Sequence, residues 1–319
     1  MADKKNKDDQ PVDVVSQFLG GDGDTSSAFV ALIGAPNAGK STLLNALVGA
    51  KVAIVTHKVQ TTRTRLTGIA QAGKAQLVFI DTPGIFAPKR RLDRAMVQAA
   101  WQGADDAELV VLLIDSKKGL TEDVEAILEN LKNSGRRAFL ALNKVDLIRP
   151  EKLLALSKAV NDRLPFEETF MISAANGDGV SDLKAALANT APPGPWMYPE
   201  DQVADITLRL MAAEMTREQV YLNLHDELPY SIMVETEAYK EQRNGSVRIE
   251  QVIHVQRDSQ KGMVIGKGGS MLKRLGERAR AEMEASFDQK VHLFLHVRVT
   301  PRWQDDRLAY KDMGLDYVD

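Results

Sequence analysis

The chain has 319 residues, which at about 150 residues per domain predicts two domains that each bury a core. Hydrophobic residues make up 44% and charged residues 27%, so a chain that is disordered or collagen-like throughout is excluded. The absence of cysteine excludes disulfides and thiol nucleophiles, and the net charge of −3 means that any nucleic-acid site must be a local basic patch.

The first 27 residues mix charges with glycine and serine and contain few apolar side chains, so residues 1–27 are expected to be a disordered tail. This segment lacks the apolar stretch of a secretory signal. The longest aliphatic run, residues 109–114, is far shorter than the roughly 20 residues that cross a bilayer. We therefore expect a cytoplasmic protein without a transmembrane helix.

Residues 28–190 alternate apolar runs with helical patterns. A strand at 29–33 precedes a helix at 41–48, and strands at 65–71 and 74–80 form a hairpin with its turn at Ala72-Gly73. Three further apolar runs follow, each separated from the next by a helical pattern: 109–114, 137–142 and 169–172. This order predicts an α/β domain with a mostly parallel sheet and helices on both faces.

Four prolines within residues 191–199 predict a stiff, extended linker over 191–200. Beyond it, residues 201–319 predict a small α+β domain. The expected order is a helix at 203–224, strands at 230–240 and 247–257, a glycine-rich turn, a helix to about 286 and a strand at 290–300.

The sequence G-A-P-N-A-G-K-S at 34–41 matches the phosphate-loop pattern G-x-x-x-x-G-K-[ST], after a strand and before a helix. Backbone N–H groups and the helix N-terminus attract phosphate oxygens, Lys40 reaches the β and γ phosphates, and Ser41 is a ligand for Mg²⁺. The residues assigned to this loop are Gly34, Ala35, Pro36, Asn37, Ala38, Gly39, Lys40, Ser41 and Thr42.

Further motifs follow predicted strands. D-T-P-G supplies Asp81, expected to support Mg²⁺, and Gly84, whose amide can meet the γ-phosphate. N-K-V-D supplies a carboxylate that accepts two hydrogen bonds from guanine and that adenine would leave unpaired, which favours GTP over ATP. Its residues and those of S-A-A, whose backbone could meet the guanine oxygen, are Asn143, Lys144, Asp146, Ser173, Ala174 and Ala175.

The loop between the first two motifs contains two threonines. We expect Thr62, with Thr61 as the alternative, to complete the Mg²⁺ shell when the γ-phosphate is present, which would make this loop a switch. Ile85 stands where many small GTPases have a water-orienting glutamine, so intrinsic hydrolysis is expected either to be slow or to be assisted by other groups. The candidate is Asn37, which can ligate K⁺ near the β–γ bridge. The catalytic residues expected are Asn37, Lys40, Thr62 and Gly84.

The cationic run Lys89-Arg90-Arg91 could supply an arginine finger, although such a run is more typical of a solvated face.

In the second domain, V-I-G-K-G-G at 264–269 resembles the loop with which KH domains clamp a nucleotide backbone. A second nucleotide-phosphate loop is the alternative, but no G-K-[ST] follows. Residues 261–280 carry six cations against one anion, which suits a single-stranded backbone. The RNA-binding residues expected are Gly266, Lys267, Gly268, Gly269, Lys273 and Arg274. Phe294, on the polar face of the last strand, either stacks a base or fills the sheet.

Taken with G-A-P-N-A-G-K-S, Q-T-T-R, D-T-P-G, N-K-V-D and S-A-A, the linker and this second domain make residues 28–319 similar to the Era family of bacterial ribosome-assembly GTPases. The resemblance implies a type II KH domain and binding of GTP or GDP with Mg²⁺ and K⁺. It also implies a monomer that binds the 3′ end of 16S rRNA during 30S subunit maturation, without DNA as a partner. Members are cytoplasmic and lie peripherally at the inner membrane. The alternative is an RNA-binding module with another RNA target and little turnover.

Overall fold

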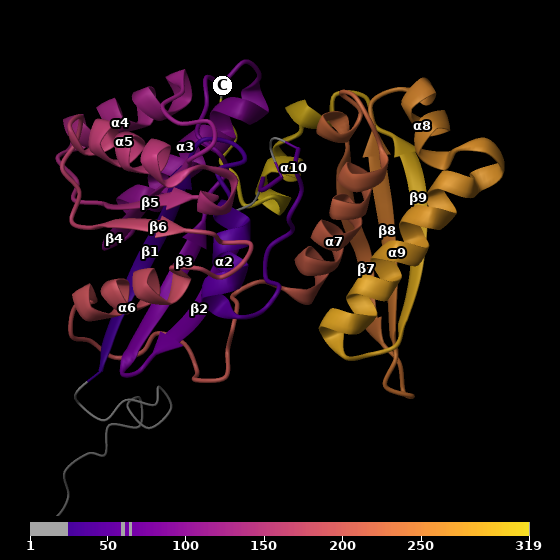
Figure 1. The fold of residues 1–319 in the computed structure, drawn as a ribbon. Coiled ribbons are helices and arrows are strands. Elements are labelled where there is room, and N and C mark those ends of the chain that lie inside the picture. Colours follow the sequence, from indigo (N-terminus) through magenta and orange to yellow (C-terminus); the bar gives the residue numbers. More distant parts are fainter. Residues whose placement is uncertain (1–24, 59–60, 64–65, 319) are drawn as a thin grey trace, which may run out of the picture.

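The computed structural model describes residues 25–58, 61–63 and 66–318, which form two lobes (Figure 1). The first contains a six-stranded sheet in the order β2-β3-β1-β4-β5-β6. Strand β2 (Leu66–Ala72) runs antiparallel to β3 (Ala75–Asp81), and the other pairs are parallel. Their bounds are β1 (Ser26–Gly34), β4 (Leu109–Asp115), β5 (Phe139–Asn143) and β6 (Thr169–Ile172).

Helices cover both faces of this sheet (Figure 1). One face packs against α2 (Lys40–Val48) and α6 (Val180–Thr190), and the other against α3 (Arg91–Asp105), α4 (Glu122–Ser134) and α5 (Pro150–Asn161). Strands β3 and β4 are buried along their whole length, which explains why they are apolar apart from Gln76 and Asp81 in β3 and Asp115 in β4. Because parallel strands end at one edge, the loops after β1, β3, β5 and β6 meet there.

The second lobe contains a three-stranded sheet in the order β7-β8-β9, with β7 and β8 antiparallel and β8 and β9 parallel. Two long helices, α7 (Leu208–Asn223) and α9 (Ser270–Phe287), pack on one face of the sheet, whereas alternate residues of β9 are exposed on the other. The strands are β7 (Met233–Glu241), β8 (Val247–Val255) and β9 (Val291–Val299).

Three expected boundaries are corrected. The tail predicted over 1–27 lies outside the described residues up to 24, but Ser26 and Ser27 belong to β1. The hairpin turn is one residue later than expected, because Ala72 pairs with Ala75 and leaves Gly73 and Lys74 as the loop. Helix α7 begins at Leu208 rather than at 203, because residues 203–205 lie extended along β2, where Ile69 N–H donates to the Val203 carbonyl at 2.9 Å.

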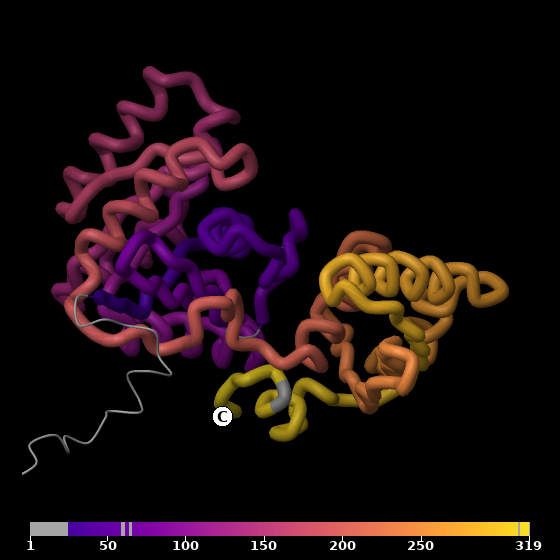
Figure 2. The backbone as a smooth tube through the Cα atoms, turned by 90° about the horizontal axis from the view of Figure 1, so that it is seen from below, coloured from indigo at the N-terminus to yellow at the C-terminus, as the bar shows by residue number. Residues whose placement is uncertain are grey.

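Two helices were not expected. Helix α8 (Asp258–Ile265) lies between β8 and the glycine loop, so the second lobe has the order α-β-β-α-α-β. After β9, the chain returns to the first lobe and forms α10 (Arg307–Asp312) against it (Figure 2). None of the helices in the described part of the chain is long and apolar enough to cross a membrane.

Candidate functional site

The phosphate loop folds around the amine of Lys40, which donates to the carbonyls of Gly34 at 3.0 Å and Ala35 at 3.2 Å. Burial lowers the pKa of Lys40 to about 8, and the Asp81 carboxylate partly offsets this effect. Gly39 has a φ of +101°, and a Cβ there would lie 2.3 Å from Nδ2 of Asn143. Only glycine fits this position.

Three oxygens converge beside Lys40. The Ser41 hydroxyl donates to Oδ2 of Asp81 at 2.7 Å, and the Thr62 hydroxyl donates to the same oxygen at 3.0 Å. The two hydroxyls are 2.7 Å apart. Burial raises the pKa of Asp81, while Lys40 opposes the shift, and Oδ1 of this carboxylate is buried without a hydrogen-bond partner among the described residues. Hydroxyl and carboxylate oxygens fit Mg²⁺, and the unpartnered oxygen is free to hold a ligand.

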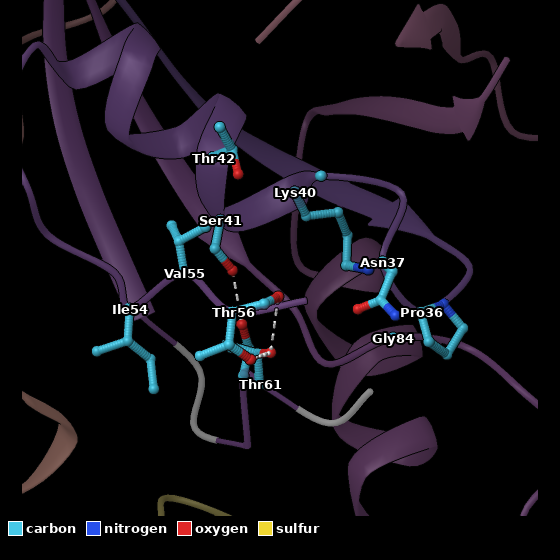
Figure 3. Close-up of a pocket in the computed structure, with 12 residues that line it drawn as sticks. Pro36, Asn37, Lys40, Ser41, Thr42, Ile54, Val55, Thr56, Thr61 and Gly84 are labelled. Carbon is cyan, nitrogen blue, oxygen red and sulfur yellow. Dashed lines mark hydrogen bonds between the residues drawn. The ribbon is translucent and has the colours of Figure 1, made fainter. Parts of the chain in front are cut away.

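The structure brings Thr62, rather than Thr61, to this cluster. The Thr61 hydroxyl turns away and contacts the Lys58 carbonyl and the Thr56 hydroxyl, each at 2.7 Å. The three threonines Thr56, Thr61 and Thr62 line a cavity of about 60 Å³ with the phosphate loop and Gly84 (Figure 3). A Cβ on Gly84 would lie 2.9 Å from the Pro36 Cα, so glycine is needed for this close approach to the loop.

The N-K-V-D segment is tied to the phosphate loop. Asn143 donates to the Ala38 carbonyl at 2.8 Å and accepts from Ala174 N–H at 3.0 Å, so it joins three of the predicted motifs. The Lys144 amine donates to the carbonyl of Asn37 and to Oδ2 of Asp115, both at 2.7 Å. Asp146 is exposed, so its carboxylate is accessible to a ligand. It lies in the short turn Val145–Leu147 that follows.

Near these motifs, Ser173 and Ala174 are buried and Ala175 is exposed. The Asn37 side chain donates to the His57 carbonyl at 3.1 Å, which links the phosphate loop to the switch loop. Thr42 follows Ser41 in the first turn of α2 and also lines the cavity. Ile85 packs into the core, and its N–H donates to the Gly34 carbonyl at 3.1 Å, so the side chain offers no polar group to water.

Within the run at 89–91, Arg91 is placed neither as an arginine finger nor as a fully solvated side chain. Its guanidinium donates to Oδ1 of Asp305 at 2.7 Å and to the Tyr317 hydroxyl at 2.5 Å, and it lies 4.9 Å from that ring. Arg91 therefore anchors the C-terminal segment, and it is neither a finger at the phosphates nor part of a purely solvated face.

The glycine loop of the second lobe joins α8 to α9. Gly266 has a φ of +74°, and a Cβ there would lie 2.7 Å from that of Met271, so the tight turn between the helices requires glycine. Gly268 has a φ of +60° with no atom within 4 Å of an added Cβ, which leaves this side of the loop open. The Lys267, Lys273 and Arg274 side chains are exposed around it. The loop is therefore basic and accessible to a polyanion.

Phe294 is 44% exposed on the outer face of β9, and the guanidinium of Arg248 lies 4.6 Å from its ring. The side chain therefore does not fill the sheet. Gly269, with a φ of +79°, begins helix α9 next to the open side of the loop.

Sequence reasoning missed Arg63, which is 1% exposed and lies against the second lobe. Arg63 is one of two arginines in a threonine-rich loop, and no sequence signal distinguishes it from a solvated cation. Its partners, among them the carbonyl of Ile232 at 2.7 Å, come from far along the chain.

Two family models match the chain: one described as a 50S ribosome-binding GTPase over residues 29–144, and one described as a KH domain over residues 227–304. The GTPase Era of Rhizobium meliloti (strain 1021) is 58% identical over 293 residues, which cover 92% of this chain and 94% of that protein. The chain belongs to the Era GTPase family. It is thus a GTPase with a C-terminal KH domain, which confirms the predicted family, fold class and activity.

Two solved Era structures match with TM-scores of 0.87. One is a complex of Era with MgGDPNP and nucleotides 1506–1542 of 16S ribosomal RNA; it is 35% identical and covers 91% of this chain and 99% of that one. The other is a variant of Aquifex aeolicus Era bound to GDP·AlF4⁻, which is 34% identical with the same coverage. The agreement spans both domains of the Era fold.

Proposed function

We propose that this Era-family GTPase binds the 3′ end of 16S rRNA during assembly of the 30S subunit and that bound GTP controls its affinity for the RNA. One observation carries the proposal: a solved Era relative that holds MgGDPNP and nucleotides 1506–1542 of 16S rRNA matches 91% of this chain with a TM-score of 0.87. Because the match includes both domains, it supports the binding of the same two kinds of ligand, a guanine nucleotide and 16S rRNA.

The RNA would lie on the open side of the loop at residues 266–269. Gly268 and Gly269 leave room for a nucleotide backbone, and Lys267, Lys273 and Arg274 supply positive charge around it. Phe294 offers an exposed ring on which a base can stack.

The nucleotide would occupy the edge where the loops after β1, β3, β5 and β6 meet. The backbone of residues 34–42 holds the phosphates, and Lys40 exchanges its carbonyl partners for β and γ oxygens. Asp146 and the backbone at Ser173, Ala174 and Ala175 select guanine. Asn143 and Lys144 hold this recognition segment against the phosphate loop through the bonds to Ala38 and Asn37.

Ser41 and Thr62 would ligate Mg²⁺, and Asp81 would support it in the same cluster. Magnesium supplies positive charge to the β and γ phosphates as negative charge develops there. Thr62 can join this shell only while its loop remains against Ser41, so the position of the loop reports whether the γ-phosphate is present. Gly84, packed on Pro36, brings the second loop to the same phosphate.

Hydrolysis would depend on Asn37, because Ile85 gives no polar group to the attacking water. The Asn37 amide lies at the junction of the phosphate loop and the switch loop, where its oxygen can ligate K⁺. Potassium there would offset charge at the β–γ bridge as an arginine finger does.

The protein would act as a monomer in the cytoplasm, where the 30S subunit is assembled, without a DNA partner. A peripheral association with the cytoplasmic face of the inner membrane is part of the proposal and rests on the family resemblance.

The proposal is tested by the binding of a labelled RNA with the sequence of the 16S 3′ end to the full-length protein. Aspartate tolerates the backbone of Gly268 and meets no neighbour, so Gly268→Asp adds a negative charge to an intact loop. We expect RNA affinity to fall at least about tenfold, because a phosphate contact is replaced by repulsion. Gly268→Asn, of the same shape without the charge, is the matched control.

Calorimetry should show unchanged GTP affinity in both variants. Equal RNA binding by Gly268→Asp and the wild type would contradict the assignment of the RNA site.

A further inference from the structure

Arg63 directly follows Thr62 and is buried in the KH domain. Its guanidinium donates to the Ile232 carbonyl at 2.7 Å, to the Tyr230 carbonyl at 2.9 Å and to the Tyr221 hydroxyl at 2.8 Å. The side chain is 1% exposed. A charge at this depth is tolerated because acceptors of the KH domain surround it.

Thr62 lies on the nucleotide side of the same short segment. Its hydroxyl contacts Ser41 and Asp81, while the next residue is fixed in the other domain. Adjacent Cα atoms are about 3.8 Å apart, so neither residue can move far without displacing the other. The preceding residue is held as well, because Arg217 of α7 donates to the Thr61 carbonyl. The KH domain therefore holds the segment 61–63 where this segment contacts the Mg²⁺ cluster.

The contacts continue from Arg63 to the RNA loop. Ser231 lies between two carbonyls that accept from Arg63, and its hydroxyl accepts from the side chain of Gln260 at 3.0 Å. Gln260 is in the first turn of α8, where its own oxygen accepts from Gln256 N–H at 2.8 Å. Helix α8 ends at the glycine loop. Hydrogen bonds on either side of the backbone of residues 230–232 therefore join the residue after Thr62 to the helix that presents the RNA clamp.

The burial of Arg63 makes this connection two-state. If the loop left the KH domain, the Arg63 guanidinium and the KH-domain carbonyls would lose one another as partners, but water could then hydrate them. A small displacement would break the same hydrogen bonds without admitting water to replace them. Seating and release are thus favoured over intermediate positions. A ligand that binds Thr62 more tightly when the loop lies on the KH domain than when it is released shifts the population toward the bound arrangement.

We propose that Arg63 is a positioning residue that uses the KH domain to hold Thr62 at the Mg²⁺ site and thereby couples GTP to the RNA clamp. This inference rests on the proposed role of Thr62. On this proposal, residues of the RNA-binding domain help to hold a Mg²⁺ ligand of the GTPase site. RNA that fixes the clamp and Mg·GTP that fixes Thr62 then stabilise the same arrangement.

The first test measures GTP hydrolysis by the full-length protein as a function of Mg²⁺ concentration. In Arg63→Ala, Thr62 is no longer held, so we expect the Mg²⁺ concentration for half-maximal rate to rise about tenfold, within the usual range of coupling between sites. GDP affinity should stay within about twofold of the wild type, because GDP has no γ-phosphate for the loop to sense. A merely structural role would change both or neither.

Lys51→Ala is the matched control. Lys51 is another cation between the domains, and it pairs with Glu218 at 2.7 Å and with Glu282 rather than with a residue of the Mg²⁺ cluster. Its loss should leave the Mg²⁺ dependence unchanged. A rise as large as that in Arg63→Ala would show that any loosening of the domains has this effect and would overturn the inference.

The second test uses Ser231→Ala, which removes one hydroxyl from the KH side of the path. We expect the Mg²⁺ dependence of hydrolysis to match that of the wild type. The RNA affinity of this variant should be the same with a non-hydrolysable GTP analogue as with GDP. A retained difference in both Ser231→Ala and Arg63→Ala would overturn the coupling. If the wild type itself shows no difference, the proposed switch fails, while the Mg²⁺ titration of Arg63→Ala still decides whether Arg63 positions Thr62.

Discussion

The buried amine of Lys40 shows how one residue is prepared for a charged ligand. In the protein its hydrogen bonds are to two backbone carbonyls, and burial lowers its pKa to about 8 from the usual 10.5. Between these values the unfolded chain holds more protons than the folded one, so this residue's contribution to stability rises with pH across that window. A triphosphate supplies the negative charge that restores the protonated form.

Nucleotide binding should therefore take up a proton above pH 8. We predict an uptake close to one proton per GTP at pH 9 and almost none from this group at pH 6.5, where Lys40 is already charged. Calorimetry of GTP binding in two buffers with different ionisation enthalpies measures this number. The same uptake at both pH values would show that the pKa of Lys40 is not lowered in the free protein.

The Asn37 side chain gives a second prediction at this scale. If its amide oxygen holds K⁺, GTP hydrolysis should be faster in K⁺ than in Na⁺ at equal ionic strength, by about a hundredfold or more if the ion replaces an arginine finger. Asn37→Ala should lose the difference while still binding GDP. Equal wild-type rates in the two salts would rule out this role.

Residue roles were predictable where a motif fixes the chemistry and unpredictable where distant chain supplies the partners. Lys40, Ser41 and Asp81 belong to motifs whose spacing implies their geometry, and the structure places them together. The choice between Thr61 and Thr62 needed the fold, because either hydroxyl satisfies the sequence pattern. The burial of Arg63 depends on acceptors more than 150 positions away, such as the Tyr221 hydroxyl, which no local pattern encodes.

Elements with one unbroken pattern were predicted well. The strand expected at 169–172 matches β6. Strands β4 and β5 lie within two residues of expectation, because every residue in them is buried and buried parallel strands are continuous apolar runs. Helix α8 was missed because its sequence, D-S-Q-K-G-M-V-I, contains a glycine and buries only Val264. Its helical state depends on capping by Gln260 and on packing against α9 and β9.

The predicted linker is an element whose surroundings decide its form. It was expected to be a stiff, extended connector. It lies on the first domain, where the Trp196 indole donates to the Lys74 carbonyl at 3.0 Å and Tyr198 N–H donates to Gln76 at 3.0 Å. The extended path then continues along β2 to the start of α7. Proline explains why the segment is extended, and sequence alone does not show what it contacts.

At the scale of the whole molecule, two of the contacts between the nucleotide domain and the KH domain meet at one turn of the KH domain. The segment 61–63 lies against α7 and residues 229–232. The C-terminal segment lies against the first lobe (Figure 2), where it packs on α3 in an apolar cluster that includes Met96, Trp303 and Tyr310. The Trp303 indole donates to the Ser231 carbonyl at 2.9 Å, so both connections reach the same turn of the KH domain. The loops that would contact the γ-phosphate are thus joined to the RNA-binding domain in two places.

The most direct test of this account is the reciprocity of its two ligands. The affinity of the full-length protein for RNA with the sequence of the 16S 3′ end is measured with a non-hydrolysable GTP analogue and with GDP, both with Mg²⁺, and the affinity for each nucleotide is then measured with and without the RNA. We predict tighter RNA binding with the GTP analogue, by about fivefold or more, and an equal strengthening by RNA of the preference for the analogue over GDP. RNA affinity that is the same with both nucleotides would contradict the account.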